Sequence, residues 1–235
     1  MLTNRSSLAL ALLFVVMLPG CFTGSGRLED RSFAVEGFDA VSASRYVSVD
    51  VRHGDAFAVE VTADDNLWPH LHVRREGSEL VVTLSDAYAT YQDVTVHAVV
   101  TMPSLTALSL SGGARGTIDG FPTLSALRVH GSGGSVVEGS ADALDLRVEL
   151  SGGSHATLDG TSEALSLDAS GGSAAELLDL SARAVSVSLS GGSHGVVTAS
   201  ERLDYHLSGD SHLDYAGNPT LGTQELSGGA DVAQR

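Results

Sequence analysis

The sequence LSGGSH occurs twice, at residues 150–155 and 189–194, and raises the question of a nucleophilic serine. Gly195 follows the second copy, so Ser193 stands in a G-x-S-x-G pattern with a histidine beside it. That pattern marks a nucleophile elbow, in which the serine sits on a sharp turn from a strand into a helix. No helical periodicity follows residue 195, so the local context does not favour an elbow.

The serine motif belongs to a repeat of about 19 residues. Anchors spaced by 19, 21, 19, 20, 18 and 19 residues fall at Ser111, His130, Ser151, Ser170, Ser190, Ser208 and Ser227. The position of Ser193 holds serine in other copies (Ser154, Ser173, Ser211) and a different residue in the rest (Ala114, Gly133, Ala230). A catalytic serine is not expected to recur in this way. We therefore interpret the motif as a corner between two strands.

Histidine and aspartate recur one repeat apart and could chelate a metal ion. The position four residues after each anchor reads Arg115, Gly134, His155, Ala174, His194, His212 and Asp231. If the repeats stack, equivalent positions lie about 4.8 Å apart, so His194, His212 and Asp231 would be neighbours. Imidazole and carboxylate are suitable ligands for Zn²⁺ or a similar ion. A solvated face that tolerates these residues is the alternative interpretation.

Two further groups of residues suggest surface contacts. Two residues before each anchor, Arg128 with Glu149 and His206 with Glu225 would form ion pairs between adjacent repeats. Three aromatic residues lie in or beside polar loops, where exposed rings could stack on sugars: Trp68, Tyr88 and Tyr91. Because Trp68 precedes Pro69, it suits the edge of the core equally well.

The elements that position these residues are short strands. On both sides of the glycines apolar and polar residues alternate, which gives each strand one buried and one wet face. A single repeat cannot bury its apolar face, but stacked repeats can, so residues 106–235 predict a narrow parallel β-solenoid in an all-β protein. Residues 33–105 alternate without the repeat and are expected to form strands that cap it, at 46–51, 57–62, 71–74, 80–84 and 94–101.

The N-terminus has the features of an export signal. Arg5 precedes an eleven-residue apolar run at residues 8–18, which is too short to span a bilayer. The run ends in Leu-Pro-Gly-Cys, which resembles a bacterial lipobox, so we expect residues 1–20 to be a signal peptide and Cys21 to be lipidated. Ordinary cleavage near Gly20 is the alternative. Residues 21–32 are rich in glycine, serine and charge, and are interpreted as a tether.

Composition limits the partners. The chain has 29 acidic residues and 13 basic residues, giving a net charge of −16. So acidic a surface repels phosphate backbones, which excludes nucleic acid as an expected partner. Nothing in the sequence calls for a cofactor.

The order of the parts resembles a known family. The stretches are GFDAV at 37–41, VDV at 49–51, VEV at 59–61, and VVTMPSL at 99–105 leading into LSLSGG. Together they are similar to the head GIN domain of putative auto-transporter adhesins, a family of exported bacterial lipoproteins. The resemblance runs from about Phe33 to Tyr215. It implies a β-helical fold and an envelope location, and it provides no catalytic residues.

We expect a non-enzymatic, lipid-anchored solenoid that binds or acts as a scaffold, with the membrane, a surface glycan or an envelope protein as partner. The alternatives are a periplasmic structural or sensing lipoprotein and, less favoured, a carbohydrate-active enzyme, since the chain has no lysine and its coils are narrow. Phe22 follows Cys21 where an inner-membrane retention signal would have aspartate, which favours the outer membrane.

Overall fold

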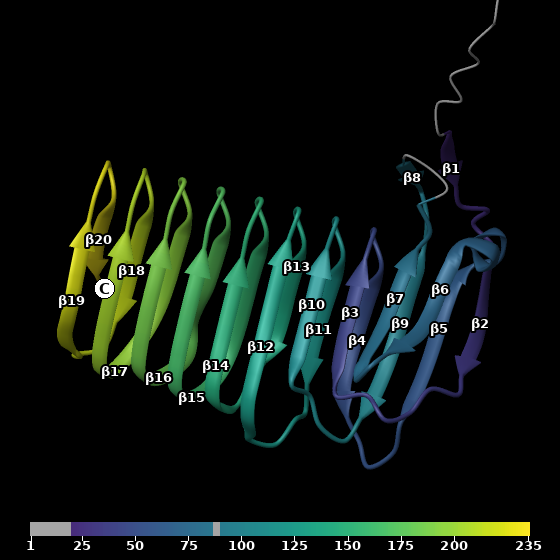
Figure 1. Ribbon diagram of the computed structural model, residues 1–235, viewed down its shortest axis with the longest axis horizontal. Coiled ribbons are helices and arrows are strands. Elements are labelled where there is room, and N and C mark those ends of the chain that lie inside the picture. The colour runs from purple at the N-terminus through teal and green to yellow at the C-terminus, as the bar shows by residue number, and fades with distance from the viewer. Residues whose placement is uncertain (1–19, 87–89) are drawn as a thin grey trace, which may run out of the picture.

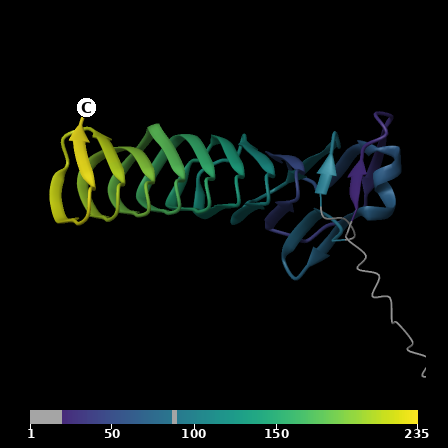
Figure 2. The ribbon, with the colours of Figure 1, turned by 90° about the horizontal axis from the view of Figure 1, so that it is seen from above.

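The computed structural model describes residues 20–86 and 90–235, which form a parallel β-solenoid with additional strands at its N-terminal end (Figure 1). Seen from above, the coils stand side by side in one row, and the C-terminus lies at the far end from the N-terminal strands (Figure 2). The predicted fold class is confirmed. None of the helical segments within the described ranges has the length and apolar character to span a bilayer.

Each coil contributes one strand to each of two sheets. The incoming sheet consists of strands that lead into the glycine corners, including β10 (Ala107–Ser111), β12 (Leu124–Ser132), β14 (Ala143–Leu150) and β19 (Thr220–Leu226). The outgoing sheet consists of strands that leave the corners, including β11 (Arg115–Asp119), β13 (Val136–Ser140), β18 (His212–Ala216) and β20 (Asp231–Gln234). Three long strands pass through the second bend and join both sheets, namely β15 (His155–Ala169), β16 (Ala174–Leu189) and β17 (His194–Leu207).

The alternating sequence buries one row of side chains from each sheet between the two. Val129, Val148, Leu167 and Val187 pair in register along the incoming sheet, and all are buried. At five successive corners two glycines adopt positive φ, as at Gly152 (61°) and Gly153 (76°), a region that residues with a Cβ rarely occupy. The corner amides bond to the next corner, so the bends are part of the stack.

The anchor of the second repeat is Ser132, so its predicted assignment to His130 is wrong. Ser111 pairs with Ser132, and the positive-φ glycines of that corner are Gly133 and Gly134. Gly131 instead lies inside β12 and faces the core, where a Cβ would meet Leu150. The sequence HGSGG offers two possible anchors, and backbone conformation selects the second.

This shift changes the predicted neighbours. Arg128 pairs with Ala107 and Arg147, so the ion pair expected with Glu149 is not formed; His130 lies opposite Glu149 instead, with Nδ1 and Oε2 3.7 Å apart. The second prediction is confirmed, since His206 Nδ1 lies 2.7 Å from Glu225 Oε2.

Part of the N-terminal region belongs to the solenoid. Strands β3 (Ala40–Ser44) and β4 (Ser48–His53) form a coil that pairs in parallel with β10 and β11 on one side. On the other side the same coil pairs with β7 (Glu79–Leu84) and β9 (Val96–Met102). The coil 40–53 is therefore inserted between two coils that follow it in sequence, and the solenoid begins well before residue 106.

The cap is built from antiparallel strands. Strand β5 (Ala58–Asp64) pairs with β9 on one edge and with β2 (Leu28–Phe33) on the other, while β6 (Leu71–Glu76) pairs with β7. A 3-10 helix, η1 (Asp65–His70), connects β5 to β6.

The segment 21–32, predicted to be a tether, is mostly paired. Strand β1 (Cys21–Thr23) lies parallel to β8 (Thr90–Gln92), and β2 takes up an edge of the cap. Its polar composition reflects the exposed position of an edge strand rather than a free linker. Residues 1–19 of the predicted signal peptide lie outside the described residues.

Candidate functional site

The serine of the G-x-S-x-G pattern is part of a structural corner. Ser193 is 1% exposed, and its hydroxyl donates to the carbonyl of Ser190 at 2.7 Å. Equivalent serines make the same bond back to the first corner residue, at 2.8 Å for Ser154 and Ser173 and 3.0 Å for Ser211. The chain then enters strand β17, as the corner interpretation predicts, with His194 on the outer surface.

The corners also carry a continuous row of outward hydroxyl groups, which we call the serine row. It lies where each incoming strand ends or directly after that end, and consists of Thr83, Ser44, Ser111, Ser132, Ser151, Ser170, Ser190, Ser208 and Ser227. Two residues earlier is a second outward row, the polar row, with Ser109, His130, Glu149, Asp168, Ser188, His206 and Glu225.

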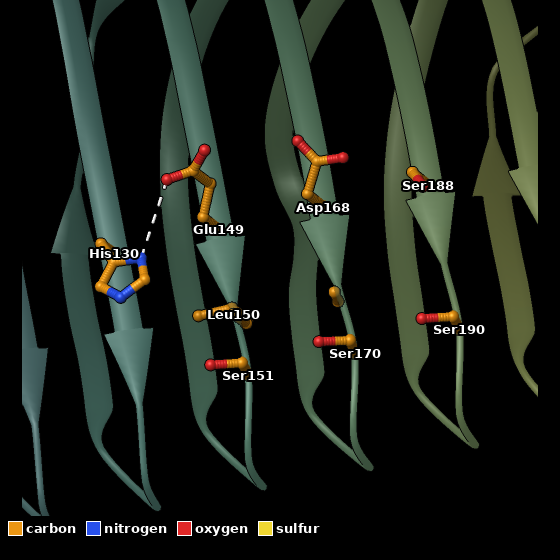
Figure 3. A pocket seen from close by; sticks show the side chains of 9 residues that line it. His130, Glu149, Leu150, Ser151, Asp168, Ser170, Ser188 and Ser190 are labelled. Carbon is orange, nitrogen blue, oxygen red and sulfur yellow. Dashed lines mark ion pairs between the residues drawn. The ribbon is translucent and has the colours of Figure 1, made fainter.

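A groove of about 280 Å³ lies between the two rows in the middle of the solenoid (Figure 3). Its floor is apolar, because Leu150 and Ala169 turn inward between the rows. Its walls are polar and come from consecutive strands: His130, Glu149, Asp168 and Ser188 on one side, and Ser151, Ser170 and Ser190 on the other. The groove therefore crosses the strands, and each coil along it contributes at least one polar side chain to its walls.

Arg147 forms ion pairs with two carboxylates that line the groove. Its Nε donates to Glu149 Oε1 at 2.5 Å and its Nη2 to Asp168 Oδ2 at 3.1 Å, so one guanidinium bridges two coils. The hydrogen bond from Arg147 lowers the pKa of Glu149 below its ordinary range, although partial burial opposes the shift. Glu149 is therefore ionised at neutral pH. Carboxylate acceptors and hydroxyl groups repeated at one-coil intervals suit an extended ligand that is rich in hydroxyl groups.

The predicted metal ligands meet, but in an ion-pair arrangement. The rings of His194 and His212 stack with centroids 5.2 Å apart. His212 Nδ1 lies 2.8 Å from Asp231 and its Nε2 lies 3.1 Å from Asp214, so both ring nitrogens face carboxylates. Asp214 is held in turn by Arg235 at 2.6 Å. Within residues 20–86 and 90–235, no group of three or more His, Cys, Asp or Glu side chains is arranged to hold a metal ion.

The carboxylates around His212 make the last coils sensitive to pH. The hydrogen bond with Asp231, and to a lesser degree the contact with Asp214, raises the pKa of His212 above its usual value of about 6.5, while partial burial opposes this. A raised folded-state pKa means that the stabilisation is fully present below about pH 6.5 and is lost as pH rises through the folded-state value.

We expect the stability difference between the wild type and His212→Gln, measured by urea unfolding, to shrink as the pH rises from about 5.5 to about 8.5. The control is His155→Gln, because the His155 ring meets the hydroxyl of Thr157 at 3.1 Å instead of a carboxylate. An equal pH dependence of both variants would contradict the assignment to His212.

Two of the three aromatic residues predicted to contact a sugar, Trp68 and Tyr91, lie within the described residues, and neither is exposed. Tyr91 is 7% exposed and its hydroxyl donates to the carbonyl of Ser85, so the prediction that its ring is free to stack on a sugar is wrong. Trp68 is half-buried beside Phe33, with the Arg31 guanidinium 4.2 Å from its ring centroid, which fits the core-edge alternative. Tyr88 lies outside the described residues.

Sequence reasoning missed the groove and the serine row, although the serines were visible as repeat anchors. As anchors these serines align the repeats, but the glycine signature alone does not indicate which way they face. The sequence signal for both rows is the spacing of two residues between each serine and the polar residue before it, since alternation along a strand places both side chains on the outer surface.

Comparison with known proteins gives one family and several similar structures. The family model described as "Putative auto-transporter adhesin, head GIN domain" matches residues 37–219. A putative adhesin from Bacteroides fragilis is similar at 20% identity and a TM-score of 0.85, over 91% of this chain and 100% of that one. A putative adhesin from Parabacteroides distasonis is similar at 16% identity and a TM-score of 0.75, over 92% and 100%.

A putative lipid binding protein from Parabacteroides distasonis is similar at 19% identity and a TM-score of 0.71, over 92% of this chain and 99% of that one. At these identities the solved structures show a shared fold. No curated protein matches the sequence.

Proposed function

Because this chain belongs to the putative auto-transporter adhesin, head GIN domain family, we propose that it is an adhesin-like protein of the cell envelope that binds or acts as a scaffold, without catalysis. The observation that carries the proposal is the groove between the polar row and the serine row. It repeats carboxylate and hydroxyl groups along the solenoid axis, which suits a surface glycan or an extended envelope polymer. The hydroxyl of Ser193 is engaged in its corner, which supports binding over acyl transfer.

The proposal includes a lipid anchor at Cys21, after removal of residues 1–20. Cys21 is exposed on β1 at the cap, and the C-terminus lies at the opposite end of the row of coils (Figures 1 and 2). An anchor there would direct the solenoid away from the membrane, with the groove accessible along its side. Incorporation of labelled palmitate into the wild type but not into Cys21→Ser tests this part; equal labelling of both would contradict it.

The proposal that the groove binds an envelope ligand is tested by filling the groove with a larger side chain. Ser170 lines the groove and is half-buried, so Ser170→Arg would place a long charged side chain across it. We expect binding of the purified protein to cell envelopes from its own host to fall about tenfold, the loss of one well-placed contact region. The readout is the amount of protein that sediments with the envelopes over a concentration series.

Ser140→Arg is the matched control, because Ser140 is also half-buried but lies in β13 on the outgoing sheet. It adds the same charge and size. Equal loss in both variants, or no binding by the wild type, would overturn the proposal. Protease accessibility on intact and permeabilised cells then separates a surface adhesin from the alternative, a periplasmic scaffold.

A further inference from the structure

The corner of the coil 40–53 differs from the corners that follow it. Gly-Gly pairs with positive φ form the bends at residues 112–113, 133–134, 152–153, 171–172 and 191–192. In the coil 40–53 the same conformation is adopted by Arg45 (φ 61°) and Tyr46 (φ 65°). Their amides still donate to the carbonyls of Ser111 and Gly112 at 3.2 Å, so this corner stacks like the others.

Two consecutive side chains in the left-handed region are unfavourable, since Cβ crowds the backbone there. Glycine would provide the same bend without strain, as the neighbouring corners show. Strain of this kind persists where the side chains have a use, and it is concentrated at binding sites.

Tyr46 offers an exposed ring. Its side chain is 54% exposed, and within residues 20–86 and 90–235 it is the one exposed Phe, Tyr or Trp. The ring lies against Gly113 of the adjacent corner: Cδ1 and Cε1 are both 3.1 Å from where a Cβ on Gly113 would stand. The ring is thus supported on the neighbouring coil while much of it remains accessible to solvent.

The ring borders a pocket of about 420 Å³, which is large enough for a small ligand. Hydroxyl groups of the serine row and the start of the adjacent corner complete the walls, which are formed by Ser44, Arg45, Tyr46, Thr90, Tyr91, Ser111 and Gly112. We call this the Tyr46 pocket. It is separate from the groove of Figure 3, although the serine row runs past both.

The charge of the Tyr46 pocket favours a neutral ligand. Arg45 forms an ion pair with Asp86, so its guanidinium does not present an uncompensated positive charge. The chain as a whole carries a charge of −16, which repels anionic sugars and phosphates. The Ser44 hydroxyl shares a hydrogen bond of 2.6 Å with the Thr83 hydroxyl and keeps further lone-pair capacity, and together with the Ser111 hydroxyl and the other N–H groups of Arg45 it offers hydrogen bonds to an uncharged ligand.

We propose that the Tyr46 pocket binds a neutral pyranose sugar. The apolar C–H face of the sugar stacks on the ring of Tyr46, and its hydroxyl groups bond to Ser44, Ser111 and Arg45. The Tyr46 pocket deepens the proposed function, because it names a ligand class and the place where the ligand is held. It rests on the proposed function only for its biological use. It also explains why this corner keeps two strained side chains.

The test is a titration of the ¹⁵N-labelled protein with the methyl glycosides of glucose, galactose, mannose and N-acetylglucosamine. At least one is expected to bind and to shift the amide signals of residues 44–46 and 111–113. This mapping uses the wild type and therefore does not depend on any variant folding. Binding of none of the four, or shifts confined to other regions, would overturn the proposal.

The double variant Arg45→Gly with Tyr46→Gly recreates the corner of the neighbouring coils. Its affinity for the glycoside should fall about tenfold or more, while its thermal midpoint stays the same or rises by up to about 4 °C because strain is removed. Tyr46→Phe keeps the ring and the strained backbone, and should retain binding. Unchanged affinity in the double variant would overturn the assignment to this pocket.

The outcome is distinguishable from that of the proposed function. Ser170→Arg leaves the Tyr46 pocket intact and should not change the glycoside titration. If envelope binding depends on Ser170 but no glycoside binds, the sugar proposal alone is wrong. If the glycoside binds at residues 44–46 but the protein does not sediment with envelopes, the sugar site stands and the proposed function is wrong.

Discussion

Gly139→Ala should lower the free energy of unfolding by about 3–5 kcal/mol, from backbone strain and overpacking together. Gly139 has φ of 130°, a conformation that is essentially restricted to glycine. A Cβ at this position would collide with the carbonyl oxygen of Ile118 on the adjacent coil and would lie 2.8 Å from its nitrogen. Since both are backbone atoms, the clash cannot be relieved by a side-chain rotation.

The effect is measured as the thermal midpoint of unfolding, which should fall by about 10 °C. Gly134→Ala is the control, because Gly134 has φ of 76° and no neighbouring atom lies within 4 Å of the added Cβ. It bears strain without a clash and should cost only about 1–2 kcal/mol. Equal costs for the two variants would show that the close contact with Ile118 is unimportant.

Asp64→Ala should release the N-terminal segment from the cap at a cost of about 2–4 kcal/mol, the price of leaving two amides without their charged acceptor. Asp64 is 1% exposed, and its two carboxylate oxygens accept hydrogen bonds from the amides of Gly26 at 2.6 Å and Thr95 at 2.7 Å. Gly24 packs directly against the carboxylate. One side chain thus ties the segment that follows Cys21 to the start of β9.

The release is detected by hydrogen exchange, with protection lost in β1 and β2 and retained in the coils from β12 onward. Asp55→Ala is the control, because Asp55 is exposed in the turn before β5. Uniform loss of protection through the whole solenoid would mean that Asp64 supports global stability instead of the local attachment.

Alternation was sufficient to predict most of the strands. The predicted segments 57–62, 71–74 and 80–84 coincide closely with β5, β6 and β7, because β5 and β7 each have one buried face and β6 alternates half-buried with exposed residues over its first four positions. The Ser-Gly-Gly repeat likewise predicted the stack and the Ser193 corner. These features are local, since each is encoded within one coil.

The errors arise where local patterns are ambiguous or absent. The stretch HGSGG contains two candidate anchor positions, His130 and Ser132, which the repeat pattern alone does not distinguish. The coil 40–53 was missed because Arg45 and Tyr46 replace the expected glycines, and only the pairing of β3 with β10 reveals it. Partners on adjacent coils depend on the register between them, so the error of two residues replaced the contact of His130 with Glu149 by one of Arg128 with Glu149.

The inserted coil also constrains the order in which the chain can fold as it emerges. From β12 onward, each coil adds to the one made just before it. Strands β3 and β4, in contrast, emerge before either neighbouring coil exists, and contacts such as Thr117 with Asp50 join residues 67 positions apart. Closing so long a loop is slow compared with adding a coil. The N-terminal coil therefore stays unpaired until β7 and β9 have emerged, and its other face is covered only when β10 and β11 are available at about residue 119, so assembly cannot proceed strictly from the N-terminus during synthesis.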